Sequence, residues 1–236
     1  MSIADNIAGI RERIATAARR AGRSPDDIAL MAVSKTVPPE NVRQAYDAGH
    51  RLFGENRVQE FAAKSASLLG LPAIEWHMIG HLQSNKAKKA AELFAAVDSL
   101  DSLHVAEKLN DAAQASGKRL AVLLELNLGG EESKTGVVPG SPQLEELLRA
   151  APRLPGLDLR GLMTVPPFNL DPQNTRPYFR RLRQLRDEIA ARRLPAVSMD
   201  MLSMGMSHDF EVAIEEGATC VRLGTSIFGE RPKEAP

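Results

Sequence analysis

Lys35 is the residue of this chain best placed to do covalent chemistry. It follows seven apolar or small residues, 28–34, so it stands at the end of a segment with the composition of a buried strand. A buried ammonium is costly unless it is paired or gives up its proton. A lysine that loses its charge in this way is a nucleophilic amine, suited to forming a Schiff base with an aldehyde. The alternative is that Lys35 only follows the strand and extends its ammonium into water.

Two short segments near the end of the chain combine hydroxyl side chains with a glycine. Residues 202–207 read LSMGMS and residues 223–226 read LGTS. A glycine lets backbone N–H groups approach an oxyanion closely, and the start of a following helix would add its positive end. The alternative is that both segments are ordinary turns with helix caps. As a pair they indicate a phosphate site.

An arginine precedes the second of these segments. Alternation along a strand places Cys220, Arg222 and Gly224 on one face. A guanidinium only donates hydrogen bonds, so Arg222 aimed at a pyridine nitrogen would keep that nitrogen unprotonated. The alternative is a structural ion pair with a neighbouring carboxylate. A lysine nucleophile, a phosphate site and an arginine for a ring nitrogen together describe a site for pyridoxal 5′-phosphate.

Eight segments with the composition of strands alternate with helical patterns along the chain. These elements must position Lys35, Arg222 and the two glycine-containing segments. The strands are expected at residues 28–35, 51–54, 74–79, 94–98, 120–128, 159–165, 196–202 and 219–224. The helices are expected at residues 3–21, 39–48, 58–69, 86–94, 103–116, 143–150, 176–192 and 209–216, and Ser2 is placed to cap the first. Repeated alternation of strand and helix predicts a parallel sheet with crossover helices.

Eight such units fit one α/β domain, a (β/α)₈ TIM barrel that spans residues 1–236 and carries an extra N-terminal helix. An open doubly wound sheet is the alternative, but no G-x-G-x-x-G motif follows the first strand. In a barrel the carboxyl ends of the strands meet at one mouth, where the last two loops often bind phosphate. Lys35, Asn56, His77 and Arg222 would then converge there.

Composition excludes several other classes of protein. Thirty basic and thirty acidic side chains give a formal net charge of zero, so neither nucleic acid nor an anionic membrane is an expected partner. Cys220 is the single cysteine, which rules out an intramolecular disulfide and indicates a reducing compartment. No signal peptide and no apolar run of membrane-spanning length is evident, so we expect a cytoplasmic location. His77 and His81 straddle a strand end, and no metal site is expected.

Five ordered segments of the sequence resemble the signatures of the pyridoxal phosphate homeostasis protein family. They are residues 32–35 (AVSK), 53–60 (FGENRVQE), 76–86 (WHMIGHLQSNK), 202–207 (LSMGMS) and 221–229 (VRLGTSIFG). The resemblance implies a barrel of alanine-racemase type in which Lys35 holds pyridoxal 5′-phosphate as an internal aldimine. It also implies that Asn56 and His77 flank the cofactor ring and that Arg222 meets its nitrogen. The residues that the resemblance implies for the phosphate are Ser203, Met204, Gly224 and Thr225.

The rival function is that of a pyridoxal phosphate-dependent amino-acid racemase. Racemisation by two bases needs an acid/base group on each face of the substrate. In racemases that resemble this fold, the second base comes with an added β domain and a partner subunit, whereas only seven residues follow Gly229 here. We therefore expect a monomeric cofactor-binding protein without strong catalytic activity. The resemblance extends this role to vitamin B6 and amino-acid homeostasis, with pyridoxal phosphate-dependent apoenzymes as candidate partners.

A third class of function uses the same residues differently. A barrel that acts on a sugar phosphate would use the same phosphate loops, with Lys35 as the Schiff-base residue of an aldolase. Colour separates the two hypotheses, since a protein with bound pyridoxal phosphate is yellow and an aldolase is not.

Overall fold

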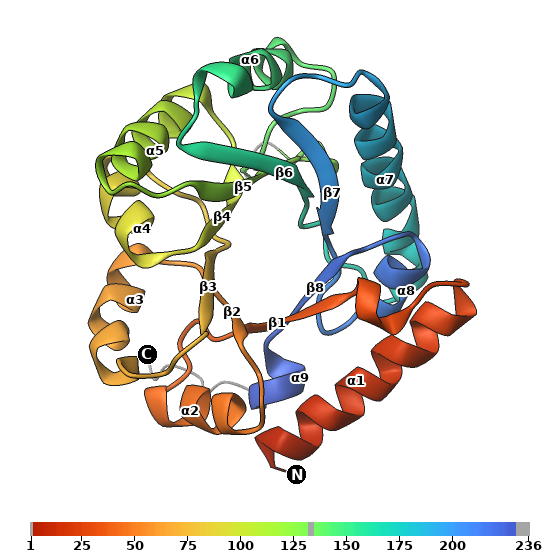
Figure 1. Ribbon diagram of the computed structural model, residues 1–236. Helices are drawn as coiled ribbons and strands as arrows, with labels where there is room; N and C mark the ends of the chain where they lie inside the picture. The colour runs from red at the N-terminus through yellow and green to blue at the C-terminus, as the bar shows by residue number, and fades with distance from the viewer. Residues whose placement is uncertain (1, 132–134, 230–236) are drawn as a thin grey trace.

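The first strand of the chain pairs with the last, which closes the sheet into a barrel. The computed structural model describes residues 2–131 and 135–229, and its eight parallel strands follow chain order around the barrel (Figure 1). The strands are β1 (Ala29–Val33), β2 (Leu52–Glu55), β3 (Glu75–Met78), β4 (Ala96–Leu100), β5 (Leu120–Glu125), β6 (Leu157–Met163), β7 (Val197–Ser203) and β8 (Cys220–Leu223). The predicted (β/α)₈ barrel is confirmed, although its predicted span includes residues outside those described.

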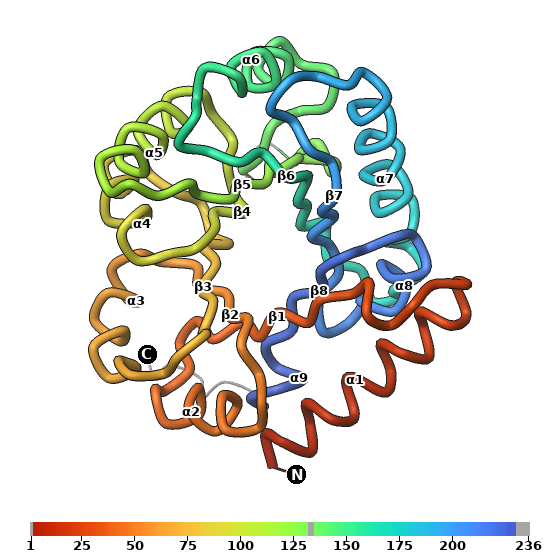
Figure 2. The backbone as a smooth tube through the Cα atoms, viewed as in Figure 1, coloured from red at the N-terminus to blue at the C-terminus, as the bar shows by residue number. Residues whose placement is uncertain are grey.

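Helices surround the ring of strands, as the backbone trace shows (Figure 2). The α-helices of the described residues are α1 (Ile3–Arg20), α2 (Pro39–Asp47), α3 (Val58–Ser65), α4 (Ala87–Leu93), α5 (Leu103–Ala115), α6 (Pro142–Ala150), α7 (Arg176–Ala191), α8 (Phe210–Glu215) and α9 (Thr225–Phe228). Short 3₁₀ turns lie at Pro25–Asp27, Ala66–Leu68, Ser84–Lys86, Ala151–Arg153 and Pro172–Thr175. Each strand from β1 to β8 is therefore followed by one helix, as in a regular barrel.

The N-terminal helix completes the outer layer where the last unit is short. Helix α9 has only four residues, and α1 packs against α9, α8 and α2 (Figure 1). The predicted cap is present, since Ser2 and Asp5 form a reciprocal capping box at the start of α1. Isoleucines at three- and four-residue spacing form the buried face of α1, and Asn6 donates to the carbonyl of Ile227 over 2.9 Å. The extra helix therefore covers part of the barrel wall.

Aromatic side chains fill part of the space between the strands and the helices. Trp76 on β3 packs against Phe53 on β2 and Phe61 on α3, with ring centroids 5.0 and 4.5 Å apart. Because neighbouring residues of a strand point to opposite faces, His77 must point into the barrel. Side chains of β3 thus alternate between the outer layer and the barrel interior.

The observed strand ends differ from the predicted ones by a few residues. Strand β1 ends at Val33, two residues before Lys35, whereas the sequence placed Lys35 at the strand end. Ser34 still donates its backbone N–H to Gly54, but Val37 then donates to the Ser34 carbonyl over 2.9 Å and turns the chain. Lys35 therefore lies in a turn. The end of a strand depends on such contacts with other parts of the chain, which sequence composition does not record.

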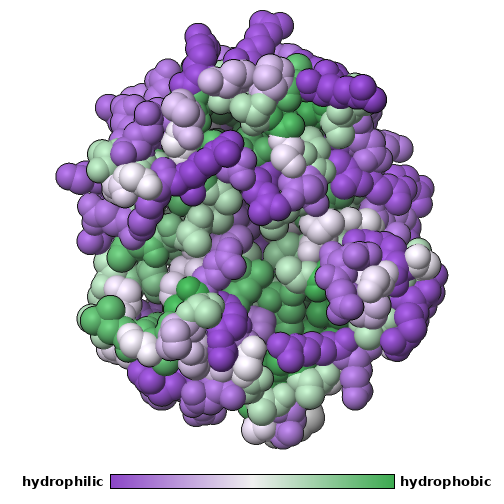
Figure 3. Space-filling view, in the orientation of Figure 1, coloured by the Kyte–Doolittle hydropathy of each residue, from purple (hydrophilic) through white to green (hydrophobic). Residues whose placement is uncertain are grey.

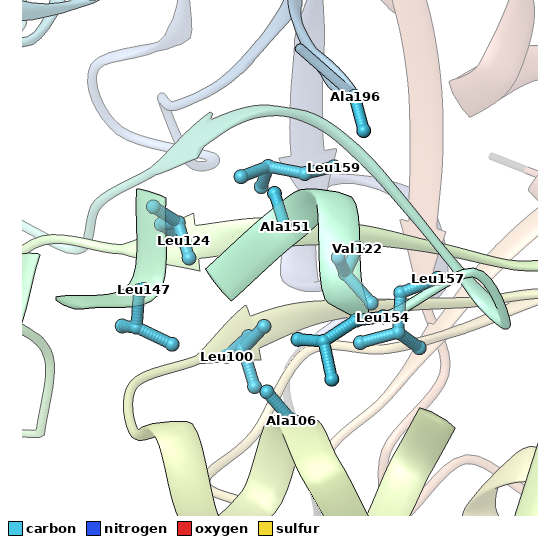
Figure 4. Close-up of a pocket in the computed structure, with 10 residues that line it drawn as sticks. All are labelled: Leu100, Ala106, Val122, Leu124, Leu147, Ala151, Leu154, Leu157, Leu159 and Ala196. Carbon is cyan, nitrogen blue, oxygen red and sulfur yellow. The ribbon is translucent and has the colours of Figure 1, made fainter. Parts of the chain in front are cut away.

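A small cavity lies between the barrel and the helices that cover β4, β5 and β6. The side chains that line it are apolar, and the labelled ones, among them Leu100, Leu124 and Leu159, surround it (Figure 4). It contains about 20 Å³ of free space, whereas sites for small molecules usually span a few hundred Å³. This cavity is a gap in packing, so the functional site must be sought elsewhere.

The surface shown in Figure 3 is mostly hydrophilic at the periphery, with hydrophilic and hydrophobic residues mixed towards the centre. In the part of the chain that the structure describes, no helix has both the length and the apolar character needed to cross a lipid bilayer.

We predict that the packing of α1 contributes strongly to stability. Replacing buried Ile7 by alanine should lower the free energy of unfolding by about 2 to 5 kcal/mol, because the change leaves a cavity against the barrel. Urea denaturation followed by circular dichroism measures this. The control is Glu12→Ala on the exposed face of the same helix, with an expected change within about 0.5 kcal/mol. Equal effects of the two substitutions would show that α1 does not support the barrel.

Candidate functional site

Lys35 lies at the carboxyl end of β1, in the turn that leads to α2. It is half-buried, so it is neither fully buried nor fully extended into water, the two alternatives that the sequence left open. The next residue, Thr36, has a φ of 61°, in the left-handed region that non-glycine residues rarely adopt. Lys35 therefore lies in a turn whose conformation must be maintained by surrounding contacts, and the strand does not continue through it.

Arg222 on β8 extends across the barrel interior to the ends of two other strands. Its Nη1 donates to Ser203 Oγ over 2.8 Å, and its Nη2 donates to the carbonyl of Thr164, just after β6, over 2.9 Å. Burial lowers the pKa of this guanidinium, and nearby acidic groups, including Asp98 and Glu125, oppose the shift. Within residues 2–131 and 135–229, no carboxylate lies within ion-pair distance of Arg222. The alternative of a structural ion pair is therefore not what the structure shows.

Lys35 follows β1 and Arg222 lies in the neighbouring strand β8, at the same end of the barrel. Strand β1 pairs with β8, with Met31 opposite Arg222. Lys35 follows the carboxyl end of β1, and the contacts of Arg222 with Ser203 and Thr164 lie at the carboxyl ends of β7 and β6. The two side chains that the sequence selected are thus at one mouth.

Asn56 follows β2 at this mouth and is half-buried. Its Oδ1 atom is buried and has no hydrogen-bond partner among the described residues. Its backbone packs against Gly80, where any added Cβ would collide with the Asn56 carbonyl. A buried acceptor without a partner is costly in a folded protein, so a donor from a bound molecule would stabilise it.

His77 lies within β3 and is only 4% exposed. Its Nδ1 is 3.0 Å from Asp98 Oδ1 and its Nε2 is 3.2 Å from Glu75 Oε1. Burial by itself lowers the pKa of His77, but the charge and hydrogen bond of Asp98, together with Glu75, outweigh it and raise this pKa to about 9. Both ring nitrogens are therefore engaged by carboxylates.

The two predicted phosphate-binding segments lie side by side, since the N–H of Ser226 donates to Ser207 Oγ over 3.4 Å. Within them the structure separates the four residues that the resemblance implied. Ser203 and Met204 are fully buried; the Ser203 hydroxyl accepts from Arg222, and the Met204 N–H donates to the Cys220 carbonyl. In contrast, Gly224 is half-buried and Thr225 is exposed at the start of α9.

Sequence reasoning missed Glu125, the last residue of β5. Its Oε1 accepts from Thr135 Oγ1 over 3.1 Å, while its Oε2 is buried without a partner in the described part of the chain. Burial raises the pKa of this carboxyl, and the hydrogen bond from Thr135 partly opposes the shift. A single acidic residue in the apolar segment LAVLLELNL was the signal that could have identified it. Glu125 adds a titratable group to the barrel interior that holds Arg222.

Comparisons with known proteins identify the family of the chain. Residues 6–232 match the family described as alanine racemase, N-terminal domain. A pyridoxal phosphate homeostasis protein from Aquifex aeolicus is 47% identical over 231 residues, which cover 98% of this chain and 99% of that protein. The chain belongs to the pyridoxal phosphate homeostasis proteins. The protein of that name from Escherichia coli K12 is 44% identical over 97% of each chain. The family that the sequence motifs indicated is confirmed.

Solved structures support the same assignment. PipY from Synechococcus elongatus PCC7942, solved with pyridoxal phosphate bound, is 38% identical, with a TM-score of 0.85 over 97% of this chain and all of that chain. The alanine racemase of Clostridium difficile 630 superposes with a TM-score of 0.72, covering 98% of this chain and 58% of the racemase. At 15% identity the racemase shows a shared fold alone. The predicted barrel of alanine-racemase type is thereby confirmed.

We predict that His77 makes stability depend on pH. The folded protein retains the His77 proton up to about pH 9, whereas the unfolded chain releases it near the ordinary value of 6.5. The stabilisation is complete below pH 6.5 and is lost as the pH rises to about 9, at up to about 1.4 kcal/mol per pH unit. Urea denaturation at a series of pH values measures this slope. In His77→Gln the component should vanish, and an unchanged slope would show that another group titrates.

Proposed function

We propose that this chain binds pyridoxal 5′-phosphate covalently through Lys35 and acts in the homeostasis of this cofactor. The observation that carries the proposal is that Lys35, in the turn after β1, and Arg222, on the paired strand β8, lie at one end of the barrel. The names of the relatives and the pyridoxal phosphate in PipY support it. When bound, the cofactor supplies an aldehyde that condenses with primary amines.

The residues at the mouth fit this group. Arg222 uses two N–H donors for Ser203 and Thr164, so others among its five remain for a ring nitrogen. Asn56 offers a buried acceptor that lacks a partner among described residues. Gly224 and Thr225 lie at the accessible start of α9, where backbone N–H groups suit a phosphate. We assign Ser203 and Met204 to the same phosphate site, as the buried residues that support it.

The protein acts in this proposal as a carrier and not as an efficient catalyst. A guanidinium only donates hydrogen bonds, so Arg222 leaves the ring nitrogen unprotonated and limits how strongly the ring withdraws electrons. His77 cannot serve as a base while it is protonated and held by Asp98 and Glu75. These two features weaken carbanion chemistry while leaving the capture of the aldehyde intact.

Amino-acid racemisation is the second candidate, because the fold is shared with alanine racemases and the buried carboxyl of Glu125 has a raised pKa. A chiral assay with alanine and serine separates the two functions. The carrier proposal expects turnover far below the 1–10³ s⁻¹ that is typical of enzymes. Turnover within that range, abolished by Glu125→Gln, would establish the racemase instead.

We further propose that the protein works as a cytoplasmic monomer that supplies pyridoxal phosphate-dependent apoenzymes. A single buried thiol, Cys220, is compatible with a reducing compartment. An accessible mouth at Lys35 allows the covalent link to be exchanged with an incoming amine. Sedimentation velocity tests the monomer, and transfer of the cofactor to a purified apoenzyme tests the supply.

We predict that Lys35→Ala abolishes covalent capture of the cofactor. Wild-type protein incubated with pyridoxal phosphate and then separated from unbound cofactor should show an absorbance band near the visible edge that disappears on reduction with borohydride. The variant should lack this band, because it lacks the amine that forms the link. Lys89→Ala, which removes an exposed lysine of α4, is the control and should retain the band. A band that persists in Lys35→Ala would assign the cofactor to another lysine.

A further inference from the structure

A second lysine, Lys64 on α3, contacts the turn that carries Lys35. Its side chain is only 10% exposed. Its Nζ donates to the carbonyl of Ser34 over 2.7 Å and to the carbonyl of Val37 over 3.2 Å. These two carbonyls lie on either side of Lys35 and Thr36 in the chain, so one ammonium ties together both ends of the turn.

The third contact of Lys64 is an ion pair with Glu55, the last residue of β2. Lys64 Nζ lies 2.6 Å from Glu55 Oε1, and the same oxygen accepts from Ser34 Oγ over 2.7 Å. Glu55 is fully buried. Ser34 is therefore held twice, by its side chain through Glu55 and by its carbonyl through Lys64. Helix α3 and strand β2 both act on the residue that precedes Lys35.

The contacts of Lys64 also separate its role from that of Lys35. An ammonium has three N–H donors, and the two carbonyls and the carboxylate use all three. An amine engaged in this way and nearly excluded from solvent is a poor nucleophile. Lys35 by contrast is half-buried and lies at the mouth.

A buried ion pair of this kind is not an efficient way to stabilise a fold. Removing two charges from water costs several kcal/mol, and apolar or neutral replacements of similar volume are often as stable. Glu55 Oε2 is in addition buried without a hydrogen-bond partner in the described ranges. A turn with a left-handed Thr36 needs surrounding contacts to maintain it. Placement of Lys35 therefore explains the buried pair of Glu55 and Lys64 better than a contribution to the stability of the fold does.

We propose that Lys64 and Glu55 are positioning residues, which hold the turn so that the Lys35 amine meets the aldehyde of the cofactor. This inference rests on the proposed function. A displacement of about 1 Å at a reacting group can reduce a rate by about a hundredfold. Loss of the pair should thus slow covalent capture, while the barrel remains folded.

The test compares the double variant Glu55→Gln/Lys64→Met with wild type. The double variant removes both charges at similar volume and avoids leaving one buried charge unpaired. Its urea midpoint should stay close to that of wild type, whereas the rate at which the absorbance band of captured pyridoxal phosphate grows should fall at least about tenfold. The matched control is Lys89→Met/Glu92→Gln, which removes an exposed ion pair of α4 and should leave the rate unchanged.

The outcomes are distinguishable. If wild type itself captures no pyridoxal phosphate, the proposed function fails. If wild type captures it and the folded double variant does so at the same rate, the positioning role of Lys64 and Glu55 is overturned. If the double variant loses its native urea transition, Ser34→Ala decides, because it removes only the hydrogen bond to Glu55. A slower capture by Ser34→Ala supports the role, and a wild-type rate overturns the positioning role of Glu55, whose contact with the turn is this hydrogen bond.

Discussion

The pairing of β1 with β8 is the constraint on which the site depends. Residues 35 and 222 are far apart in the sequence, and only closure of the barrel makes their strands neighbours. Parallel strands bring their carboxyl ends to the same side, so the two residues lie at the same mouth. Helix α1 supports this closure from outside, because it packs over the short helix α9 that follows β8. The N-terminal helix thus helps to hold the strands that carry the site, although it lies on the outside of the barrel.

Buried charge is the second feature of the barrel. Arg222, the protonated His77 and its partner Asp98 lie inside the wall of strands, and Glu55 and Lys64 lie beside it. Each of these groups is costly to remove from water. His77 and the Glu55–Lys64 pair are held by opposite charges, whereas Arg222 is held by neutral oxygens. Arg222 is therefore the buried charge whose placement is hardest to explain by stability alone.

The sequence predicted the architecture well and the details of the site less well. Alternating strand and helix patterns were sufficient for the barrel, and the cap at Ser2 was correct. The end of β1 was placed too late, because the turn at Lys35 depends on contacts with β2 and α3. The contacts of Lys64 with the turn at Lys35 could not be predicted from the sequence. Nor could the pairing of His77 with Asp98, since Asp98 is 21 residues away along the chain and no local pattern links these two residues. The sequence also did not show that Ser203 and Met204 are fully buried while Gly224 and Thr225 are more accessible. This difference is evident only in the folded structure.

Lys35 and Arg222 are proposed to act on the same bound aromatic aldehyde. The most direct test uses pyridoxal phosphate labelled with ¹⁵N in its ring. Nitrogen NMR of the complex at neutral pH reports the protonation of the ring, and reduction with borohydride followed by peptide mapping locates the covalent link. We expect an unprotonated ring nitrogen and a label on the peptide that contains Lys35. A protonated nitrogen, or a label on a different lysine, would contradict it.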